Sequence, residues 1–295
     1  MENIIEVKNF SKYFWEKQVI KDISFSIKKW EIFAYLWINW SWKTTTIRSL
    51  LDIYKADTWE LKILWEKINE SIFNKIWYLP EERWLYLDEN VYDILYFFGK
   101  LKWMADKDLK KGIDEYLEKV WLTEKKYAKL KSLSSWQQQK IQFWVAIIHN
   151  PEILILDEPM KWLDPINRQL FINMILEQKA KWTTILFSSH QMDDVEKMVD
   201  SLIILKKWEI WAYWSLKEVK NKYWKNTIKV SFTWKFQENK DFYDVNTLTN
   251  NFAELRPKVS SNEILKFFLD SNLNINKFEF SEPSLNDIFI SINEL

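Results

Sequence analysis

Residues 37–44 read Trp-Ile-Asn-Trp-Ser-Trp-Lys-Thr and end in two side chains that suit a bound triphosphate. The ammonium group of Lys43 can hold the β- and γ-phosphates, and the hydroxyl of Thr44 can bind Mg²⁺. The stretch follows a short apolar run and precedes a predicted helix, which is the usual setting of a phosphate-binding loop. As written, however, three indole side chains would fill the phosphate site, and we would expect no nucleotide to bind.

The tryptophans are abnormal in number and in position. The chain has 20 Trp and 2 Gly among 295 residues. Together they make up about 7.5% of the chain, close to the ordinary share of glycine alone. Trp30, Trp59, Trp182 and Trp208 lie in short polar stretches between apolar runs, where turns favour glycine. We therefore interpret all 20 positions as glycines, encoded by UGA in a lineage where UGA means Gly but translated as Trp. The alternative is a protein that is truly rich in tryptophan.

With glycines restored, residues 37–44 become Gly-Ile-Asn-Gly-Ser-Gly-Lys-Thr, which is the phosphate-binding pattern G-x-x-x-x-G-K-[ST]. Glycines suit this loop because backbone N–H groups wrap the phosphates closely, and a Cβ would obstruct them. A chance loop is the alternative. The pattern predicts ATP contacts from Trp37, Asn39, Trp40, Ser41, Trp42, Lys43, Thr44 and Thr45.

A second candidate site is the apolar run Ile153–Leu156, which ends in Asp157 and Glu158 and resembles a Walker B motif. Asp157 would contact Mg²⁺, directly or through water, and Glu158 would orient or deprotonate the attacking water. A buried strand with a solvated acidic end would give the same pattern. The phosphate loop upstream favours the catalytic interpretation.

Residues 133–140 narrow the class of ATPase. With glycine at 136 they read Leu-Ser-Ser-Gly-Gln-Gln-Gln-Lys, about 20 residues before Asp157. The stretch resembles the signature motif of ABC ATPases, usually written LSGGQ, although Ser135 replaces the first of its two glycines. An ordinary helix N-cap is the alternative. The resemblance implies that this segment binds the γ-phosphate of ATP held by a second copy of the chain, through Ser134, Ser135, Trp136 and Gln137.

Three single residues fit the same family. Phe14 matches the aromatic residue that stacks on adenine, Asp164 lies in a stretch that resembles the D-loop at the dimer interface, and His190 resembles the switch histidine that senses the γ-phosphate. A core residue, a turn at a helix start and a structural histidine are the respective alternatives. The other histidine, His149, is interpreted as structural.

The Q-loop position departs from the family pattern. Residues 78–86 read Tyr-Leu-Pro-Glu-Glu-Arg-Trp-Leu-Tyr, with Glu81 where the family has Gln. Glu81 could still bind Mg²⁺ or water, but its charge changes the local electrostatics. This stretch resembles a subgroup of two-component exporters related to sodium-extrusion and drug-export ATPases. That subgroup carries a C-terminal appendage ending in a pattern like residues 282–289, so the resemblance implies export.

The elements that must position these residues alternate between strand and helix, which implies a parallel α/β sheet with right-handed crossovers. The fold class predicted is therefore α/β, and the resemblance to ABC ATPases implies a P-loop NTPase of ABC type with a helical subdomain at about 90–148. A polar stretch at 221–226 favours a linker, so we expect domains at 1–220 and 221–295, the second a small α+β domain. Strands are predicted at 4–9, 19–27, 32–36, 75–79, 152–156, 184–188, 227–233 and 274–280, helices at 44–53, 166–180, 261–270 and 284–292, and a hairpin at 202–213.

Composition limits the partners. Lys+Arg and Asp+Glu are both 42, so no basic excess points to nucleic acid, and the absence of Cys excludes disulfides and thiolate metal sites. No apolar run approaches the ~18 residues of a membrane helix. The resemblance to ABC ATPases implies a protein at the cytoplasmic face of the membrane, bound to an integral membrane permease and paired head to tail with a second copy around two ATP molecules. Residues 84–98 would face the permease.

Two other functions remain open. The first is a soluble ABC ATPase of translation or DNA repair, but translation types carry two ATPase domains in one chain and repair types carry long coiled coils. Neither feature is present in this sequence. The second is a binding module without hydrolysis, which follows only if the tryptophans are real.

Overall fold

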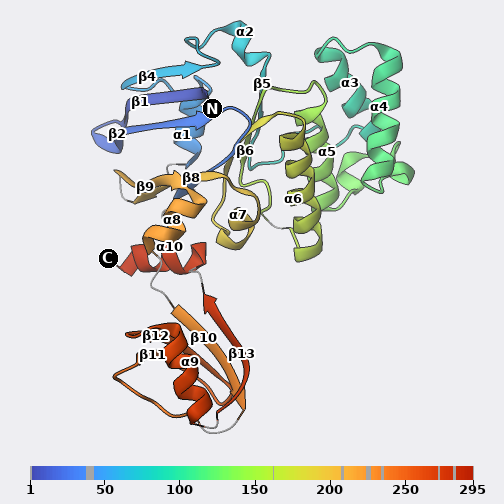
Figure 1. Ribbon diagram of the computed structural model, residues 1–295. Coiled ribbons are helices and arrows are strands. Elements are labelled where there is room, and N and C mark those ends of the chain that lie inside the picture. Colours follow the sequence, from blue (N-terminus) through green and yellow to red (C-terminus); the bar gives the residue numbers. More distant parts are fainter. Residues whose placement is uncertain are drawn as a thin grey trace. The chain divides into compact units, whose positions relative to one another are not determined.

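The computed structural model describes residues 2–37, 43–161, 163–206, 209–223, 227–233, 236–271, 273–281 and 284–294. Its contacts divide the chain into two units, Met1–Ser215 and Leu216–Leu295. Figure 1 labels most of the helices and strands of both units.

The first unit is built on a six-stranded sheet with the order β5-β6-β7-β3-β8-β9. The first five strands in this order are parallel, and β9 closes the sheet as the antiparallel arm of a β8–β9 hairpin. Every residue of β3, β6 and β7 is buried, as expected for a parallel sheet covered on both faces. The predicted parallel α/β sheet is therefore confirmed. The strands are β3 (Ile32–Trp37), β5 (Ile76–Leu79), β6 (Ile153–Asp157), β7 (Thr184–Ser188), β8 (Ser201–Lys206) and β9 (Glu209–Ser215).

A separate antiparallel sheet of three strands has the order β2-β1-β4. β1 (Asn3–Phe14) and β2 (Lys17–Lys28) contain the strands predicted at 4–9 and 19–27, and they pair as an antiparallel hairpin with its turn at Trp15. β4 (Thr58–Ile63) pairs with the other edge of β1 and was not predicted. Only Leu61 and Ile63 are buried in β4, so its apolar alternation is too short to identify a strand from sequence.

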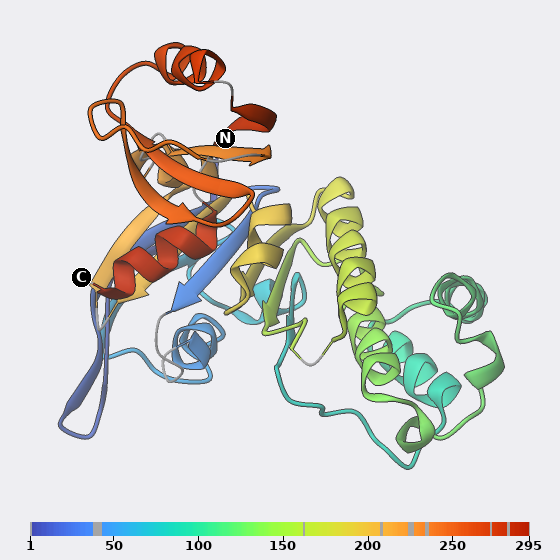
Figure 2. The same cartoon turned by 90° about the horizontal axis from the view of Figure 1, so that it is seen from below.

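Helices cover the parallel sheet. α1 (Lys43–Leu50) packs against β3 and β6, while α5 (Ser135–Ile147) packs against β5. α3 (Val91–Leu101) contacts both α4 (Asp106–Lys119) and α5, which makes the predicted helical region (Figures 1 and 2). The remaining helices of this unit are α2 (Glu70–Phe73), α6 (Pro165–Ala180), α7 (Met192–Met198) and two single turns of 3₁₀ helix, Thr123–Lys125 and Leu130–Ser132.

The second unit has an antiparallel four-stranded sheet with the order β11-β12-β10-β13. Its core joins Ile228, Val230 and Phe232 of β10 to Ile264 and Phe268 of α9. The elements are α8 (Leu216–Tyr223), β10 (Thr227–Thr233), β11 (Tyr243–Leu248), β12 (Phe252–Pro257), α9 (Ser261–Asp270), β13 (Asn274–Ser281) and α10 (Leu285–Glu294).

The linker expected at residues 221–226 is wrong for its first three residues, which end helix α8. Residues 224–226 lie outside the described chain. The segment read as polar because α8 holds three lysines among eight residues. Among residues 216–220, whose burial is described, only Val219 is fully buried, which is too little apolar pattern to mark an amphipathic helix from sequence.

The central strands should dominate the stability of the first unit. Ile203 of β8 is fully buried, so Ile203→Ala should destabilise the protein by about 2–5 kcal/mol through lost contacts and a residual cavity. Ile53 is 58% exposed, and Ile53→Ala should stay within about 0.5 kcal/mol. Urea unfolding followed by fluorescence compares the two. Equal midpoints for both variants would contradict this view of the core.

Candidate active site

The carboxyl ends of the parallel strands meet at one edge of the sheet, and the candidate catalytic residues lie there. Asp157 is the last residue of β6, and Ser188 is the last residue of the neighbouring strand β7. Thr44 lies in the first turn of α1, which follows β3. Ligands of open parallel sheets bind at this edge because the loops that leave the strands converge there.

The carboxylate of Asp157 accepts three hydroxyl hydrogen bonds. Ser188 Oγ donates to Oδ1 at 2.5 Å, Thr44 Oγ1 donates to Oδ2 at 3.2 Å, and Tyr78 Oη donates to Oδ2 at 3.4 Å. Asp157 is only 2% exposed, so these donors replace the water that a carboxylate would otherwise bind. Burial and the nearby charge of Asp157 raise the pKa of the Tyr78 hydroxyl.

Glu158 directly follows Asp157 and has an unusual backbone. Its φ is 46°, in the left-handed region that a side chain with a Cβ rarely adopts, and its N–H donates to Ser188 Oγ at 3.0 Å. Its Oε2 lies 2.8 Å from Nδ1 of His190. Glu158 is buried, whereas the imidazole of His190 is 40% exposed. Backbone strain of this kind is typical of functional sites, where the surroundings hold the residue in place.

Sequence reasoning missed Ser188 and Tyr78 as site residues. Ser188 binds both the carboxylate of Asp157 and the N–H of Glu158, so it aligns the two predicted catalytic residues. Both residues stand in stretches already singled out, at the end of β7 and in the Q-loop stretch. Only the register of β5, β6 and β7 shows that their hydroxyls reach Asp157.

The predicted phosphate loop lies mostly outside the described residues: Asn39, Trp40, Ser41 and Trp42, and the side chain of Lys43. Trp37 is the buried last residue of β3, and Thr45 is buried in α1. The hydroxyl of Thr46 lies 2.8 Å from that of Tyr35, which ties α1 to β3. A strand therefore ends at Trp37 and a helix begins at Lys43, on either side of the motif, as the motif requires.

Phe14 ends β1 and is 37% exposed. Its ring meets Tyr54 edge to face at 5.7 Å, and Lys12 Nζ lies 5.3 Å from its centre. Phe14 is therefore not a core residue, and its ring is accessible for a planar base to stack on.

The signature segment begins helix α5. Ser134 is the N-cap, and its backbone N–H donates to Gln137 Oε1 at 2.9 Å in a capping box. Ser134 and Ser135 are exposed at this helix N-terminus, where backbone N–H groups favour an anion. The ring of Trp136 lies 3.7 Å from Nζ of Lys140, and burial lowers the pKa of that lysine to about 8.

Asp164 is the exposed N-cap of α6. It accepts the backbone N–H groups of Ile166 and Asn167 at 3.1 and 3.0 Å. The bond from Asn167 holds the pKa of the Asp164 carboxyl below its usual value. Trp162 of the same stretch lies outside the described residues.

Glu81 lies in the loop after β5, and its carboxylate pairs with the ammonium group of Lys161, three residues after Glu158. Lys161 had no role in the sequence prediction. The ion pair joins the Q-loop stretch to the segment that follows the catalytic carboxylates.

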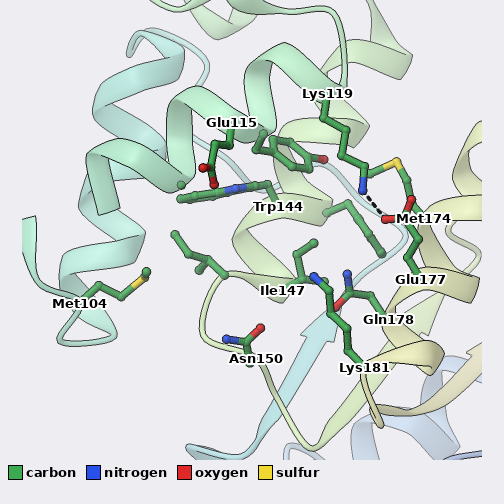
Figure 3. Close-up of a pocket in the computed structure, with 14 residues that line it drawn as sticks. Met104, Glu115, Lys119, Trp144, Ile147, Asn150, Met174, Glu177, Gln178 and Lys181 are labelled. Carbon is green, nitrogen blue, oxygen red and sulfur yellow. Dashed lines mark hydrogen bonds and ion pairs between the residues drawn. The ribbon is translucent and has the colours of Figure 1, made fainter. Parts of the chain in front are cut away.

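A pocket of about 380 Å³ lies among α4, α5 and α6, away from these residues. Trp144 and Ile147 line it, and the Lys119–Glu177 ion pair joins α4 to α6 beside it (Figure 3). None of the predicted site residues lines this pocket. We therefore place the candidate active site at the carboxyl ends of the strands and not in this pocket.

Comparison with known proteins decides the family. The ABC transporter family model matches residues 20–161, and the model "ATP-binding protein DrrA1-3-like, C-terminal domain" matches residues 215–292. The uncharacterized ABC transporter ATP-binding protein MJ1023 of Methanocaldococcus jannaschii is 42% identical over 219 residues, or 74% of this chain and 80% of that protein. The chain belongs to the ABC transporter ATP-binding proteins. It is an ABC ATPase that binds ATP, and such subunits partner with membrane permease subunits.

Further comparisons cover both units of this ABC ATPase. YhaQ of Bacillus subtilis, an uncharacterized ABC transporter ATP-binding protein, is 32% identical over 290 residues and 97% of each chain. A solved "ATP binding subunit of ABC transporter" covers 75% of this chain and 93% of its own, with a TM-score of 0.68 and 23% identity. The solved ADP conformation of MJ1267, an ATP-binding cassette of an ABC transporter, has a TM-score of 0.66 and 24% identity. That match covers 74% of this chain and 93% of MJ1267. The structural matches confirm the fold. In the described part of the chain, no helix is long and apolar enough to cross a membrane.

Ser188 should matter for turnover because it aligns Asp157 and Glu158. Ser188→Ala should lower the kcat for ATP about tenfold, the order of effect expected when a positioning hydrogen bond is lost. Thr184 lies at the opposite end of β7 and accepts the N–H of residue 30 at 2.9 Å, so Thr184→Ala is the matched control. Phosphate-release kinetics on both variants make the comparison. Equal losses of kcat would assign Ser188 a purely structural role.

Proposed function

We propose that this ABC ATPase hydrolyses ATP at the edge formed by Thr44, Asp157, Glu158 and His190, and that it powers export through a separate permease. The observation that carries the proposal is the pair of contacts at adjacent residues. Asp157 accepts the hydroxyl of Thr44, and Glu158 lies 2.8 Å from His190. The first contact suits a metal-bound phosphate, and the second suits an activated water.

Mg²⁺ fits the first pair of residues. Thr44 and Asp157 offer a hydroxyl and a carboxylate, which are the hard oxygen ligands that Mg²⁺ prefers. Within the described ranges no group of three or more acidic or histidine side chains could hold a metal by itself. This agrees with Mg²⁺ that is held by one or two protein ligands together with ATP phosphates. Glu81 was a further candidate ligand, but its carboxylate pairs with Lys161, so we assign it to that ion pair and not to the metal. The bound metal would offset phosphate charge.

Glu158 is assigned as the general base, and His190 as the residue that senses the γ-phosphate. The carboxylate of Glu158 is buried and hydrogen-bonded to His190, so its orientation is fixed before substrate binds. Lys43, with the backbone of residues 37–45, would hold the phosphates, and Phe14 would stack on adenine. Fixed charge and orientation supply most of the catalysis in phosphoryl transfer.

The signature segment and Asp164 are assigned to an interface with a second copy of the chain. Ser134, Ser135 and Asp164 are exposed, and the N-terminus of α5 presents backbone N–H groups. A helix N-terminus that is capped but open to solvent can bind a γ-phosphate from outside the chain. Two copies placed head to tail would give each ATP a phosphate loop and a partner's signature segment.

The permease would dock on an exposed apolar surface of the helical region. Tyr86, Leu87 and Phe97 are 60%, 46% and 49% exposed, and the rings of Tyr86 and Phe97 meet edge to face at 6.5 Å. Tyr86 and Phe97, together with Glu89, Asp93 and Ile94, line a groove of about 370 Å³. Apolar groups gathered on a surface with a charged rim are typical of protein interfaces. This docking places the ATPase at the cytoplasmic face of the membrane.

Export is supported by two comparisons. The second unit matches the C-terminal domain of DrrA1-3-like ATP-binding proteins over residues 215–292. The linearmycin resistance ATP-binding protein LnrL of Bacillus subtilis is 30% identical over 212 residues, or 71% of this chain and 68% of that protein. Resistance to a compound is consistent with its removal from the cell, and we extend that direction to this chain.

The ATP site also requires glycines in the phosphate loop, and we propose that the native chain has glycine at the Trp positions. Six of the twelve described non-glycine residues with positive φ are Trp, with φ between 57° and 68°. An indole side chain strains this conformation and a glycine does not. These residues are Trp15, Trp30, Trp65, Trp103, Trp121 and Trp182.

Buried tryptophans support the same proposal. The indole N–H groups of Trp37, Trp77 and Trp84 are buried and have no hydrogen-bond partner among the described residues. A buried N–H without an acceptor costs about 1–3 kcal/mol, and tryptophans in protein cores usually find one. At the other extreme, Trp15 is 99% exposed and Trp103 is 95% exposed. Neither group is placed as a tryptophan normally is.

The mass of the native protein tests this directly. The written chain has a mass of 36.2 kDa, and 20 replacements of Trp by Gly lower it to about 33.6 kDa. Intact mass spectrometry of protein purified from its own organism should give the lower value, and peptide sequencing should show glycine at each position. A native mass of 36.2 kDa would remove the case for an ATP site in this loop.

Glu158→Gln should abolish turnover and retain ATP binding, because the amide keeps the shape of the carboxylate but cannot accept the proton of the attacking water. We expect kcat to fall about 100-fold or more, within the range that general bases contribute. Glu152→Gln is the matched control, since Glu152 immediately precedes β6 at its opposite end and pairs with exposed Lys75. Phosphate release and equilibrium ATP binding measure the two effects. No ATP binding by the wild-type protein would favour a module without hydrolysis.

A further inference from the structure

The ion pair between Glu81 and Lys161 joins two loops that leave neighbouring strands. Glu81 follows β5, Lys161 follows β6, and β5 and β6 pair in parallel. The side chains are 34% and 14% exposed, so the pair is more sheltered than a typical surface ion pair. The N–H of Lys161 donates to the carbonyl of Glu158 at 3.1 Å, so one tight turn separates the lysine from the proposed general base.

Helix α5 holds the same two loops through a pair of glutamines. Gln139 Nε2 donates to the carbonyl of Pro159 at 3.2 Å, and Gln142 Nε2 donates to the carbonyl of Glu82 at 3.3 Å. The ion pair and these two bonds therefore connect three segments: the loop after β5, the loop after β6 and the signature helix. We name this set the loop clamp, made of Glu81, Gln139, Gln142 and Lys161.

We propose that Lys161 is a positioning residue for ATP hydrolysis, which neutralises Glu81 and closes the loop clamp around the catalytic carboxylates. The proposal rests on the proposed function. Asp157 and Glu158 already place two carboxylates at this edge. A third carboxylate without a counter-charge would repel a triphosphate. With Lys161 beside it, Glu81 keeps the hydrogen-bonding oxygens of a polar side chain without adding net charge to the site.

Electrostatics distinguish this role from simple packing. Removal of the ammonium group of Lys161 should leave the charge of Glu81 uncompensated, whereas removal of both charges should leave the net charge of the site unchanged. Lys161→Met is therefore expected to weaken ATP binding without Mg²⁺ about three- to tenfold, since the pair is partly screened by solvent. The added change Glu81→Gln should recover that loss to within about twofold, which is the non-additive behaviour of a coupled pair.

The experiment compares wild type, Lys161→Met, Glu81→Gln, the double variant and the conservative variant Lys161→Arg, all as full chains. ATP binding in EDTA is measured by calorimetry, and kcat and KM for MgATP by phosphate release. Hydrogen exchange of residues 81–86 and 159–161 is followed in the nucleotide-free protein. Lys179→Met is the matched control, because Lys179 forms a 2.5 Å ion pair with Asp200 outside the clamp. If Lys161→Met does not fold, Lys161→Gln replaces it.

The proposal predicts that Lys161→Met speeds exchange in both loops, that Lys161→Arg resembles wild type, and that the double variant binds ATP better than Lys161→Met. Equal losses from Lys161→Met with Glu or Gln at position 81 would overturn it, since the lysine would then act independently. It would also be overturned if Glu81→Gln raised the Mg²⁺ concentration for half-maximal rate severalfold while Lys161→Met did not, because Glu81 would then serve the metal. A wild type without ATP binding refutes the proposed function, while hydrogen exchange still tests the clamp.

Discussion

The buried carboxylate of Asp157 is the group on which the arrangement of this ATPase depends. Asp157 is only 2% exposed, so its carboxylate must be hydrogen-bonded. Burial of a carboxylate without partners would cost several kcal/mol of folding free energy. Its donors come from three elements: Thr44 from α1, Ser188 from β7 and Tyr78 from β5. The order β5-β6-β7 places Asp157 on the middle strand, between two of these donors. The same order therefore satisfies the charge and builds the proposed site.

Glu158, the residue after Asp157, is held in place by its backbone conformation and by two hydrogen-bond partners. Its left-handed backbone redirects the chain immediately after the buried strand, and its N–H and side chain are each held by a different group, Ser188 and His190. Strain at one residue persists when several contacts over-determine it. The turn that follows carries Lys161, so the backbone conformation of Glu158 also determines where the loop clamp can close.

The contacts of α5 give this helix two functions at once. Its N-terminus, capped by Ser134 and Gln137, presents the signature segment to solvent. Its next turns hold the loops after β5 and β6 through Gln139 and Gln142. Because a helix moves as a rigid element, a displacement of the signature segment by a partner would be transmitted to both loops. This would be a physical route from closure of the proposed dimer to the proposed catalytic carboxylates.

Local patterns in the sequence were enough to predict the parallel sheet and the helical region, and they singled out Thr44, Asp157, Glu158 and His190, which the structure brings together in two contacting pairs. Fully apolar five-residue strands, and polar side chains placed directly after them, are properties of short segments that need no knowledge of distant contacts. Short or weakly patterned elements such as β4 and α8 were missed, because burial by distant segments, and not periodicity, makes them ordered.

The partners of the site residues were decided only by the tertiary structure. Ser188 ends β7 and Lys161 lies in the loop after β6, so each reads as an ordinary strand or loop residue. Their importance depends on strand order and register, which bring Ser188 to Asp157 and Lys161 to Glu81 across 31 and 80 residues of chain. Sequence alone determined which chemical groups this protein has at its strand ends. The pairing of those groups required the folded sheet, because hydrogen bonds and ion pairs depend on distances in space that local sequence does not encode.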